Sequence, residues 1–361
     1  MRQTRKDRWR RVFLLAHSLM TGLAVFSGMS DGSFVHPQIA LAQSEFSLEL
    51  PLGLDREHLL IPQDNPLTHE KVTLGKFLFF DTRLSANETI ACASCHKPAL
   101  AFTDGQPVST GIHRQQGGRS APAAINRAFS TVQFWDGRAA TLEEQALGPF
   151  VNPVEHGFAT HDQLVAKVQS IAGYRPLFQR AFGSPLITKD RIGQAIASFQ
   201  RTLLSGNSPY DQFTQGGRED ALSARAKKGM QLFFGKGRCF LCHTGPNFTD
   251  ERFHNLGVGW DGDHIDLGRY TVTKAPKDIG AFKTPTLREI ARTAPYMHDG
   301  RFATLEQVVE FYNQGGIQNP FLDPLIQPLN LSQSEQADLV EFLWSLNGEG
   351  WEVEPPTQFP Q

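Results

Sequence analysis

All cysteines of the chain occur in two copies of one pattern, in which two cysteines separated by two residues are followed directly by a histidine. The first copy comprises Cys92, Cys95 and His96, and the second comprises Cys239, Cys242 and His243. This C-x-x-C-H pattern is the attachment signature of c-type haem. The two thiols can add to the two vinyl groups of one porphyrin, and the histidine can then bind the iron as its proximal ligand. The sequence therefore predicts two covalently bound haem c groups.

Cysteine pairs at this spacing also bind zinc or form redox-active disulfides. A zinc site made of the thiols would leave both neighbouring histidines without a role. A thioredoxin-like motif needs one pair rather than two, in a strand–helix context that the flanking sequence does not show. Haem is therefore the favoured interpretation, and it leaves no cysteine for a structural disulfide.

Internal repeats show which positions play equivalent roles in the two halves. The segments 75–80 (GKFLFF) and 229–234 (GMQLFF) precede the two haem motifs, and Phe-Thr-Asp follows each motif, at 102–104 and 248–250. Each half therefore resembles one small cytochrome domain, beginning with a helix that leads into the haem loop.

A second repeat relates 135–143 (WDGRAATLE) to 298–306 (HDGRFATLE), and reading both forward without a gap pairs Pro149 with Tyr312. A phenolic oxygen can bind ferric iron, whereas a proline side chain has no donor atom. If both positions face the distal sides of their haems, the second haem is six-coordinate and the first is open to a small oxidant. The alternative is that Tyr312 is an ordinary core residue of an amphipathic helix.

The N-terminus predicts export. Basic residues precede an apolar run, 12–26, and 40–42 (ALA) resembles a signal-peptidase site, so residues 1–42 are interpreted as a signal peptide. The run is short and interrupted by polar residues, so we expect that the chain is not an integral membrane protein. The alternative is that the run stays uncleaved as a membrane anchor. Export to the periplasm suits covalent haem attachment. The net charge of -2 gives no basic face for phosphates, and we expect no nucleic-acid partner.

With these motifs, the chain resembles the bacterial di-haem cytochrome c peroxidase superfamily, and within it the MauG-like branch. The resemblance runs from Pro66 to Asn347. It rests on both haem motifs and on segments 134–138 (FWDGR), 152–155 (NPVE), 295–300 (PYMHDG) and 308–312 (VVEFY).

The resemblance implies a role for each matching residue. His96 would be proximal to a peroxide-reactive N-terminal haem, and His243 to a C-terminal electron-transfer haem. Tyr312 stands where the peroxidases have a methionine ligand and MauG has a tyrosine. Glu155 matches the distal carboxylate, which can move a proton between the peroxide oxygens. Gln145 and Pro149 match other residues of the reactive pocket, and Trp135 matches the tryptophan that relays electrons between the haems.

Two histidines mark departures from the family pattern. His156 replaces the usual methionine after Glu155, where an imidazole could tune Glu155, approach the iron or face solvent. His113 lies in the loop where many peroxidases carry a histidine that blocks the reactive iron. Its offset from Ser120 is one residue short of the usual spacing, so we expect an open first haem that needs no reductive activation.

The family also binds calcium between the haems through an asparagine side chain and two backbone carbonyls. Thr293 and Pro295 match the carbonyl donors, and Ser120 replaces the asparagine, which weakens the predicted site.

The fold class that we predict is mainly α, with two cytochrome c-like domains whose haems face one another. Helical patterns cover 164–171, 191–203, 222–233 and a last helix that starts at a Ser332–Glu335 capping box and ends at Asn347-Gly348. Turn-forming residues at 205–209 indicate the break between domains. The predicted parts after the signal peptide are an extension (43–60), a peroxidatic domain (61–207), an electron-transfer domain (208–349) and a tail (350–361).

The sequence thus predicts a periplasmic oxidoreductase that reduces hydrogen peroxide at the first haem with electrons passed through the second. The donor is a small redox protein, or a protein side chain oxidised in place, and Tyr312 favours the latter. The alternative is a non-enzymatic electron carrier with two six-coordinate irons. Glu155 and its neighbours argue against a carrier, which needs no distal acid. A haem-based sensor is a third possibility, but nothing in the sequence, such as an attached output domain, favours it.

Overall fold

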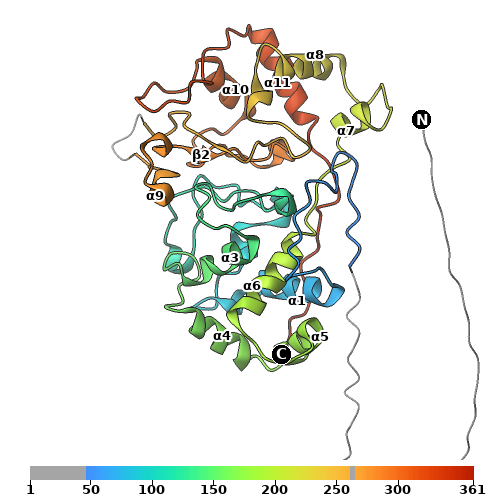
Figure 1. Cartoon of the computed structure of the whole chain (residues 1–361), viewed down its shortest axis with the longest axis vertical. Coiled ribbons are helices and arrows are strands. Elements are labelled where there is room, and N and C mark those ends of the chain that lie inside the picture. The colour runs from blue at the N-terminus through green and yellow to red at the C-terminus, as the bar shows by residue number, and fades with distance from the viewer. Residues whose placement is uncertain (1–45, 261–264) are drawn as a thin grey trace, which may run out of the picture. The chain divides into compact units, whose positions relative to one another are not determined.

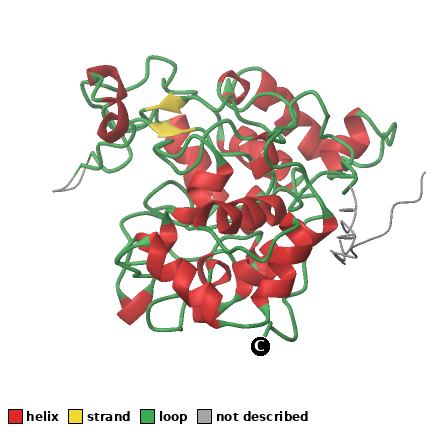
Figure 2. Cartoon of the chain, turned by 60° about the horizontal axis from the view of Figure 1, so that its bottom comes forward, coloured by secondary structure: helices red, strands yellow, loops and turns green. Residues whose placement is uncertain are grey.

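The structure is a computed structural model that describes residues 46–260 and 265–361; the predicted signal peptide lies outside these residues. Helices joined by long loops make up most of the described chain, and the named strands form one small antiparallel pair, β1 (Phe253–His254) with β2 (Phe282–Lys283) (Figure 2). The predicted mainly helical class is confirmed. Among the described residues, no helix is both long and apolar enough to cross a membrane.

The first half is built around α1 (His69–Phe80), which leads into the first haem motif and packs against α6 (Lys189–Gln200) (Figure 1). Its core contains Leu74, Leu78, Phe79 and Phe199. The other helices of this half are α2 (Cys92–Cys95), α3 (Leu142–Leu147), α4 (His161–Ser170) and α5 (Tyr174–Phe182), with 3₁₀ turns at Thr82–Leu84, Pro98–Leu100, Ile112–Arg114, Arg127–Phe129 and Pro149–Val151.

The second half repeats this plan, with α8 (Ala224–Phe234) leading into the second haem motif and packing against α11 (Gln333–Trp344). Phe233 and Phe342 lie in its core. The other helices are α7 (Pro209–Thr214), α9 (Tyr270–Thr273) and α10 (Leu305–Asn313), with 3₁₀ turns at Cys239–Leu241, Pro276–Asp278 and Ile290–Arg292.

The repeated glycine of the two haem-leading helices has one physical cause. A Cβ placed on Gly75 would lie 1.9 Å from the carbonyl oxygen of Ala195, and a Cβ on Gly229 would lie 1.9 Å from that of Asp338. In each half, therefore, the two main helices cross so closely that only glycine fits at the crossing.

The last helix starts as predicted. Ser332 Oγ accepts a hydrogen bond from the Glu335 amide, and Glu335 Oε2 accepts one from the Ser332 amide at 2.8 Å. The helix ends at Trp344, before the predicted Asn347-Gly348, and Ser345 turns its hydroxyl back to the Phe342 carbonyl at 2.6 Å.

The N-terminal extension and the C-terminal tail both pack against the helical halves. Leu48 and Leu54 of the N-terminal extension join a small core with Leu204. In the tail, Trp351 lies in the core of the first half, and the Pro360 carbonyl accepts a hydrogen bond from Arg83.

Candidate haem-binding cavity

Side chains from both halves line one cavity of about 810 Å³. Of the residues singled out from the sequence as site residues, all but Cys92 line it, and Cys92 packs against the core of the first half. The lining residues among them are Cys95, His96, Ser120, Trp135, Gln145, Pro149, Glu155, Cys239, Cys242, His243, Thr293, Pro295 and Tyr312.

The two motif histidines are held in the same way. His96 Nδ1 donates to the Phe102 carbonyl at 2.9 Å, and His243 Nδ1 donates to the Phe248 carbonyl at 3.0 Å. Phe102 and Phe248 begin the repeated Phe-Thr-Asp segments, and both have positive φ angles. A carbonyl only accepts, so each proton is on Nδ1 and each Nε2 is left with its lone pair for a metal.

Burial keeps both rings neutral. It lowers the pKa of His96, and it lowers that of His243 to about 4. A neutral imidazole with an oriented Nδ1 proton is the form that binds iron.

The four cysteines form no disulfide with one another. Burial raises the pKa of Cys92 and Cys239 to about 12 and that of Cys95 to about 11, so these side chains are neutral thiols. Two oriented histidines, each beside two unpaired thiols on a large cavity, fit two covalently attached haems.

Glu155 is held in the cavity wall by its own loop. Asn152 Nδ2 donates to Glu155 Oε1 at 2.6 Å, and the Ile112 amide donates to the Glu155 carbonyl at 3.1 Å. Gly111 permits this packing, since a Cβ there would lie 1.9 Å from the Val154 carbonyl oxygen. Burial raises the pKa of the Glu155 carboxyl, opposed by the charge of Arg138 and the bond from Asn152.

The wall around Glu155 also reaches the surface. Gln145 is on α3, and Pro149 begins the 3₁₀ turn that follows it. A smaller pocket of about 290 Å³ is lined by Pro149 and Glu155 together with the exposed residues Arg138 and Glu144.

Neither of the two histidines that depart from the family pattern is among the residues that line the cavity. His156 is only 2% exposed, its Nδ1 donates to the Leu84 carbonyl at 2.7 Å, and burial lowers its pKa to about 4. It also makes an edge contact with Phe150. The possibility that His156 faces solvent is therefore wrong, because its ring satisfies a backbone carbonyl inside the core. His113 is exposed, and among the described residues it is not part of the cavity lining.

Tyr312 lies on α10 and lines the cavity together with Val308 and Val309 of the same helix. Within the described part of the chain its hydroxyl has no hydrogen-bond partner. Burial raises the pKa of this phenol. Its oxygen is therefore neutral and available unless a cation stabilises the phenolate.

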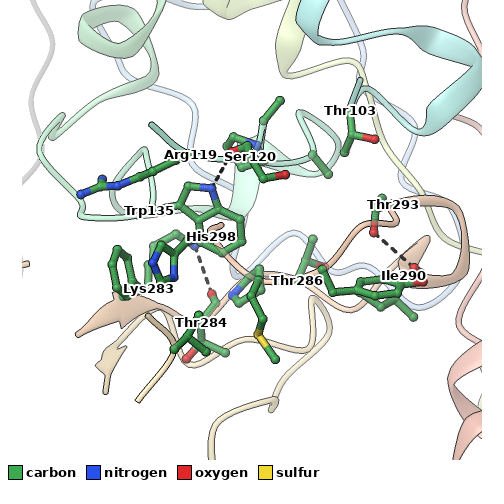
Figure 3. Close-up of a pocket in the computed structure, with 18 of the residues that line it drawn as sticks. Thr103, Arg119, Ser120, Trp135, Lys283, Thr284, Thr286, Ile290, Thr293 and His298 are labelled. Atoms are coloured by element: carbon green, nitrogen blue, oxygen red, sulfur yellow. Dashed lines mark hydrogen bonds between the residues drawn. The ribbon is translucent and has the colours of Figure 1, made fainter. Parts of the chain in front are cut away.

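Trp135 is hydrogen-bonded to both halves. Its indole Nε1 donates to the Ser120 carbonyl at 2.8 Å (Figure 3). Its own carbonyl accepts from the Lys283 amide of β2 at 2.8 Å. Thr293 lines the same cavity, and its hydroxyl donates to the Ile290 carbonyl at 3.2 Å.

Sequence reasoning missed two charged clusters in this region. His254 lines the cavity between Asp250, at 3.0 Å, and Asp323, at 2.7 Å. Arg119 bridges Asp136 and Asp266. The repeated Phe-Thr-Asp segment could have pointed to Asp250, but no local sequence pattern points to Asp323 or Asp266.

The comparisons identify the family. A family model described as "Di-haem cytochrome c peroxidase" matches residues 69–219. The chain is 42% identical over 301 residues to the methylamine utilization protein MauG of Methylophilus methylotrophus, covering 82% of this chain and 88% of the relative. It is 39% identical to the cytochrome c551 peroxidase of Nitrosomonas europaea, covering 79% and 82% of the two chains.

A solved structure agrees. The crystal structure of a MauG-like protein associated with microbial copper homeostasis matches with a TM-score of 0.78 and 34% identity, covering 86% of this chain and 98% of that one. The chain belongs to the di-haem cytochrome c peroxidase family, as the sequence motifs predicted. Membership implies haem c as cofactor, supports oxidoreductase activity and makes peroxide the expected substrate.

Proposed function

We propose that the chain is an exported, periplasmic di-haem oxidoreductase of the peroxidase and MauG type. It reduces hydrogen peroxide beside Glu155, with electrons that enter on the side of His243. The observation that carries this proposal is the asymmetry of the cavity wall, which offers Pro149 in the first half and the phenol of Tyr312 in the second.

His96 and His243 would hold the two irons through Nε2, and the cysteines of each motif would hold the porphyrins. When bound, the haems supply redox-active iron that can take up and release electrons. The proposed domain division, 61–207 and 208–349, assigns one haem to each half, with the haems facing one another.

Glu155 would move the proton. Reduction of hydrogen peroxide to two waters consumes two electrons and two protons. A desolvated carboxylate can take the proton from one peroxide oxygen and return it to the oxygen that leaves as water. Asn152 fixes the orientation of the carboxylate, and Gln145 and Pro149 shape the space beside it.

Tyr312 supports the MauG-like alternative for the electron source. An anionic oxygen ligand favours ferric iron more than a thioether does, so the second haem would have a low potential. A protein side chain oxidised in place is then the favoured electron donor, and a small redox protein is the alternative. Trp135, tied to both halves, would relay the electrons between the two sides.

Calcium is a further part of the proposal. Backbone carbonyls of Thr293 and Pro295 and the side chain of Ser120 would supply its oxygens. The carboxylates that line the described cavity are Asp136 and Glu155, and Asp136 already pairs with Arg119 and Arg138. We therefore expect a weak site, which metal analysis of the purified holoprotein before and after dialysis against a chelator would detect.

The test is the stoichiometry of peroxide reduction. The holoprotein is mixed with hydrogen peroxide and a reduced dye, and dye oxidation is followed by absorbance. The proposal predicts two electrons consumed per peroxide, and a much slower reaction for Glu155→Gln at equal haem content. A wild-type protein that leaves the dye reduced would instead be an electron carrier or an enzyme that needs activation.

A further inference from the structure

A network of contacts around Arg119 ties Trp135 to the second half of the molecule. The Arg119 guanidinium donates from Nη1 to Asp136 Oδ2 at 2.7 Å, from Nε to Asp266 Oδ2 at 2.7 Å and from Nη2 to Asp266 Oδ1 at 2.9 Å. Asp136 follows Trp135 in the chain, whereas Asp266 belongs to the second half. One side chain therefore pairs with a carboxylate from each half.

The residue after Arg119 holds the indole itself. The Ser120 amide donates to the His298 carbonyl at 2.7 Å, and the Ser120 carbonyl accepts from Trp135 Nε1 at 2.8 Å (Figure 3). The ring of Trp135 and the backbone of the second half are thus joined through one residue. That residue directly follows Arg119 in the chain.

The contacts of Arg119 are shielded from solvent and directional, so they can fix the position of its side chain. Arg119 is 20% exposed and Asp136 6% exposed, so the pair is shielded from solvent. The Arg119–Asp266 contact is bidentate, which fixes an angle as well as a distance. The Gly268 amide holds Asp266 Oδ1 at 2.9 Å, and Arg269 Nη1 donates to the Asp136 and Gly137 carbonyls at 2.9 and 2.8 Å.

We propose that Arg119 is a positioning residue for Trp135. By pairing at once with Asp136 and Asp266, Arg119 sets the geometry of electron transfer between the two halves. The proposal rests on the proposed function, because it assumes that Trp135 relays electrons. In this role Arg119 acts through Ser120 and Asp136, and its side chain also lines the cavity. Lysine cannot replace Arg119 fully, because its single ammonium group lacks the planar set of N–H donors with which a guanidinium can bind two carboxylates.

The test uses the holoprotein and three variants, Arg119→Gln, Arg119→Lys and Asp266→Asn. The matched control is Arg225→Gln, which removes an exposed pair with Asp338 outside the cavity lining. After mixing with an equimolar amount of hydrogen peroxide, freeze-quench EPR follows the ferric signals of the two haems separately. Hydrogen exchange measured by mass spectrometry follows the peptide that contains Ser120.

The expected result separates positioning from folding. In Arg119→Gln and Asp266→Asn the first-haem signal should respond at the wild-type rate, while the second-haem response slows on the order of 10- to 100-fold. The Ser120 peptide should exchange faster. Arg119→Lys should be intermediate, and Arg225→Gln should match wild type.

Two results would overturn the proposal. In one, either the second-haem response or the exchange of the Ser120 peptide stays at its wild-type value in Arg119→Gln. In the other, both haem responses slow equally, which would indicate a general structural role. A wild-type protein whose first haem ignores peroxide would refute the proposed function instead. Unchanged exchange of the Ser120 peptide in Arg119→Gln would still refute the positioning role.

Discussion

Asn152 Nδ2 donates a 2.6 Å hydrogen bond to Oε1 of Glu155. This bond stabilises the ionised carboxylate, whereas burial of the same side chain favours the protonated form and prevails. Glu155 is therefore a stronger base than an exposed glutamate, while its second oxygen is free of this contact. Both properties suit a group that must accept a proton from peroxide and return it.

The raised pKa of Glu155 predicts the pH dependence of the peroxide reaction. Below that pKa the carboxyl is protonated and cannot act as a base, so the second-order rate constant should fall as the pH decreases through it and level off above it. Glu155→Gln should remove this dependence and lower the rate about 10²- to 10⁴-fold. Stopped-flow absorbance over a pH series measures both effects.

Asn152 offers a matched control for that profile. Asn152→Ala removes a bond that lowers the pKa of Glu155, so the whole profile should move to higher pH while its upper plateau changes less than in Glu155→Gln. A profile that keeps its position in Asn152→Ala would mean that a different group titrates.

Tyr312 should be a ligand only while the second iron is ferric. Burial raises the pKa of this phenol, so phenolate forms only where a cation compensates. Tyr312→Met should therefore raise the reduction potential of one haem and leave the other near its wild-type value. Spectroelectrochemical titration of the variant and wild type measures this. Equal haem reduction potentials in Tyr312→Met and wild type would show that Tyr312 is a core residue and not an iron ligand.

His156 should contribute to stability rather than to catalysis. His156→Met leaves the buried Leu84 carbonyl without its partner, which should lower the free energy of unfolding by about 1–3 kcal/mol. Denaturant unfolding of the holoprotein measures the loss. The pH profile of the peroxide reaction should stay in place, and a displaced profile would show that His156 acts on Glu155.

His254 should stabilise the fold through its charge. Hydrogen bonds to the carboxylates of Asp250 and Asp323 raise its pKa above the usual value, and Asp250 has the largest effect. A raised pKa in the folded state gives stability that is complete below the unfolded value and is lost as the pH rises through the folded one. The loss of stability in His254→Gln should thus be largest near about pH 6 and shrink towards about pH 10. A loss that is equal at both pH values would contradict a charged His254.

The parts of this molecule that repeat were predictable from the sequence. The haem motifs, the glycine of each haem-leading helix and the Phe-Thr-Asp segments recur in both halves, so their shared roles follow from the amino-acid sequence alone. The chemical roles expected for Glu155 and Tyr312 come from family resemblance. The structure adds their surroundings, which are burial, the hydrogen bond from Asn152 to Glu155 and, among the described residues, a Tyr312 hydroxyl without a hydrogen-bond partner.

Contacts between distant segments could not be predicted in this way. Arg119 and Asp266 are 147 residues apart in the chain, and neither stands in a recognisable pattern. Trp351 lies in a proline-rich tail, yet its ring belongs to the core of the first half. His156 looked like a pocket residue because of its neighbour Glu155, but Glu155 lines the cavity while the ring of His156 is buried in the core.

The central claim, one open haem coupled to one closed by Tyr312, is tested most directly by low-temperature EPR of the ferric holoprotein. Spectra are recorded for wild type and Tyr312→Phe, with and without an equimolar amount of hydrogen peroxide. We predict a high-spin signal that vanishes with peroxide, beside a low-spin signal that Tyr312→Phe alters. Two low-spin signals that ignore peroxide would contradict the claim.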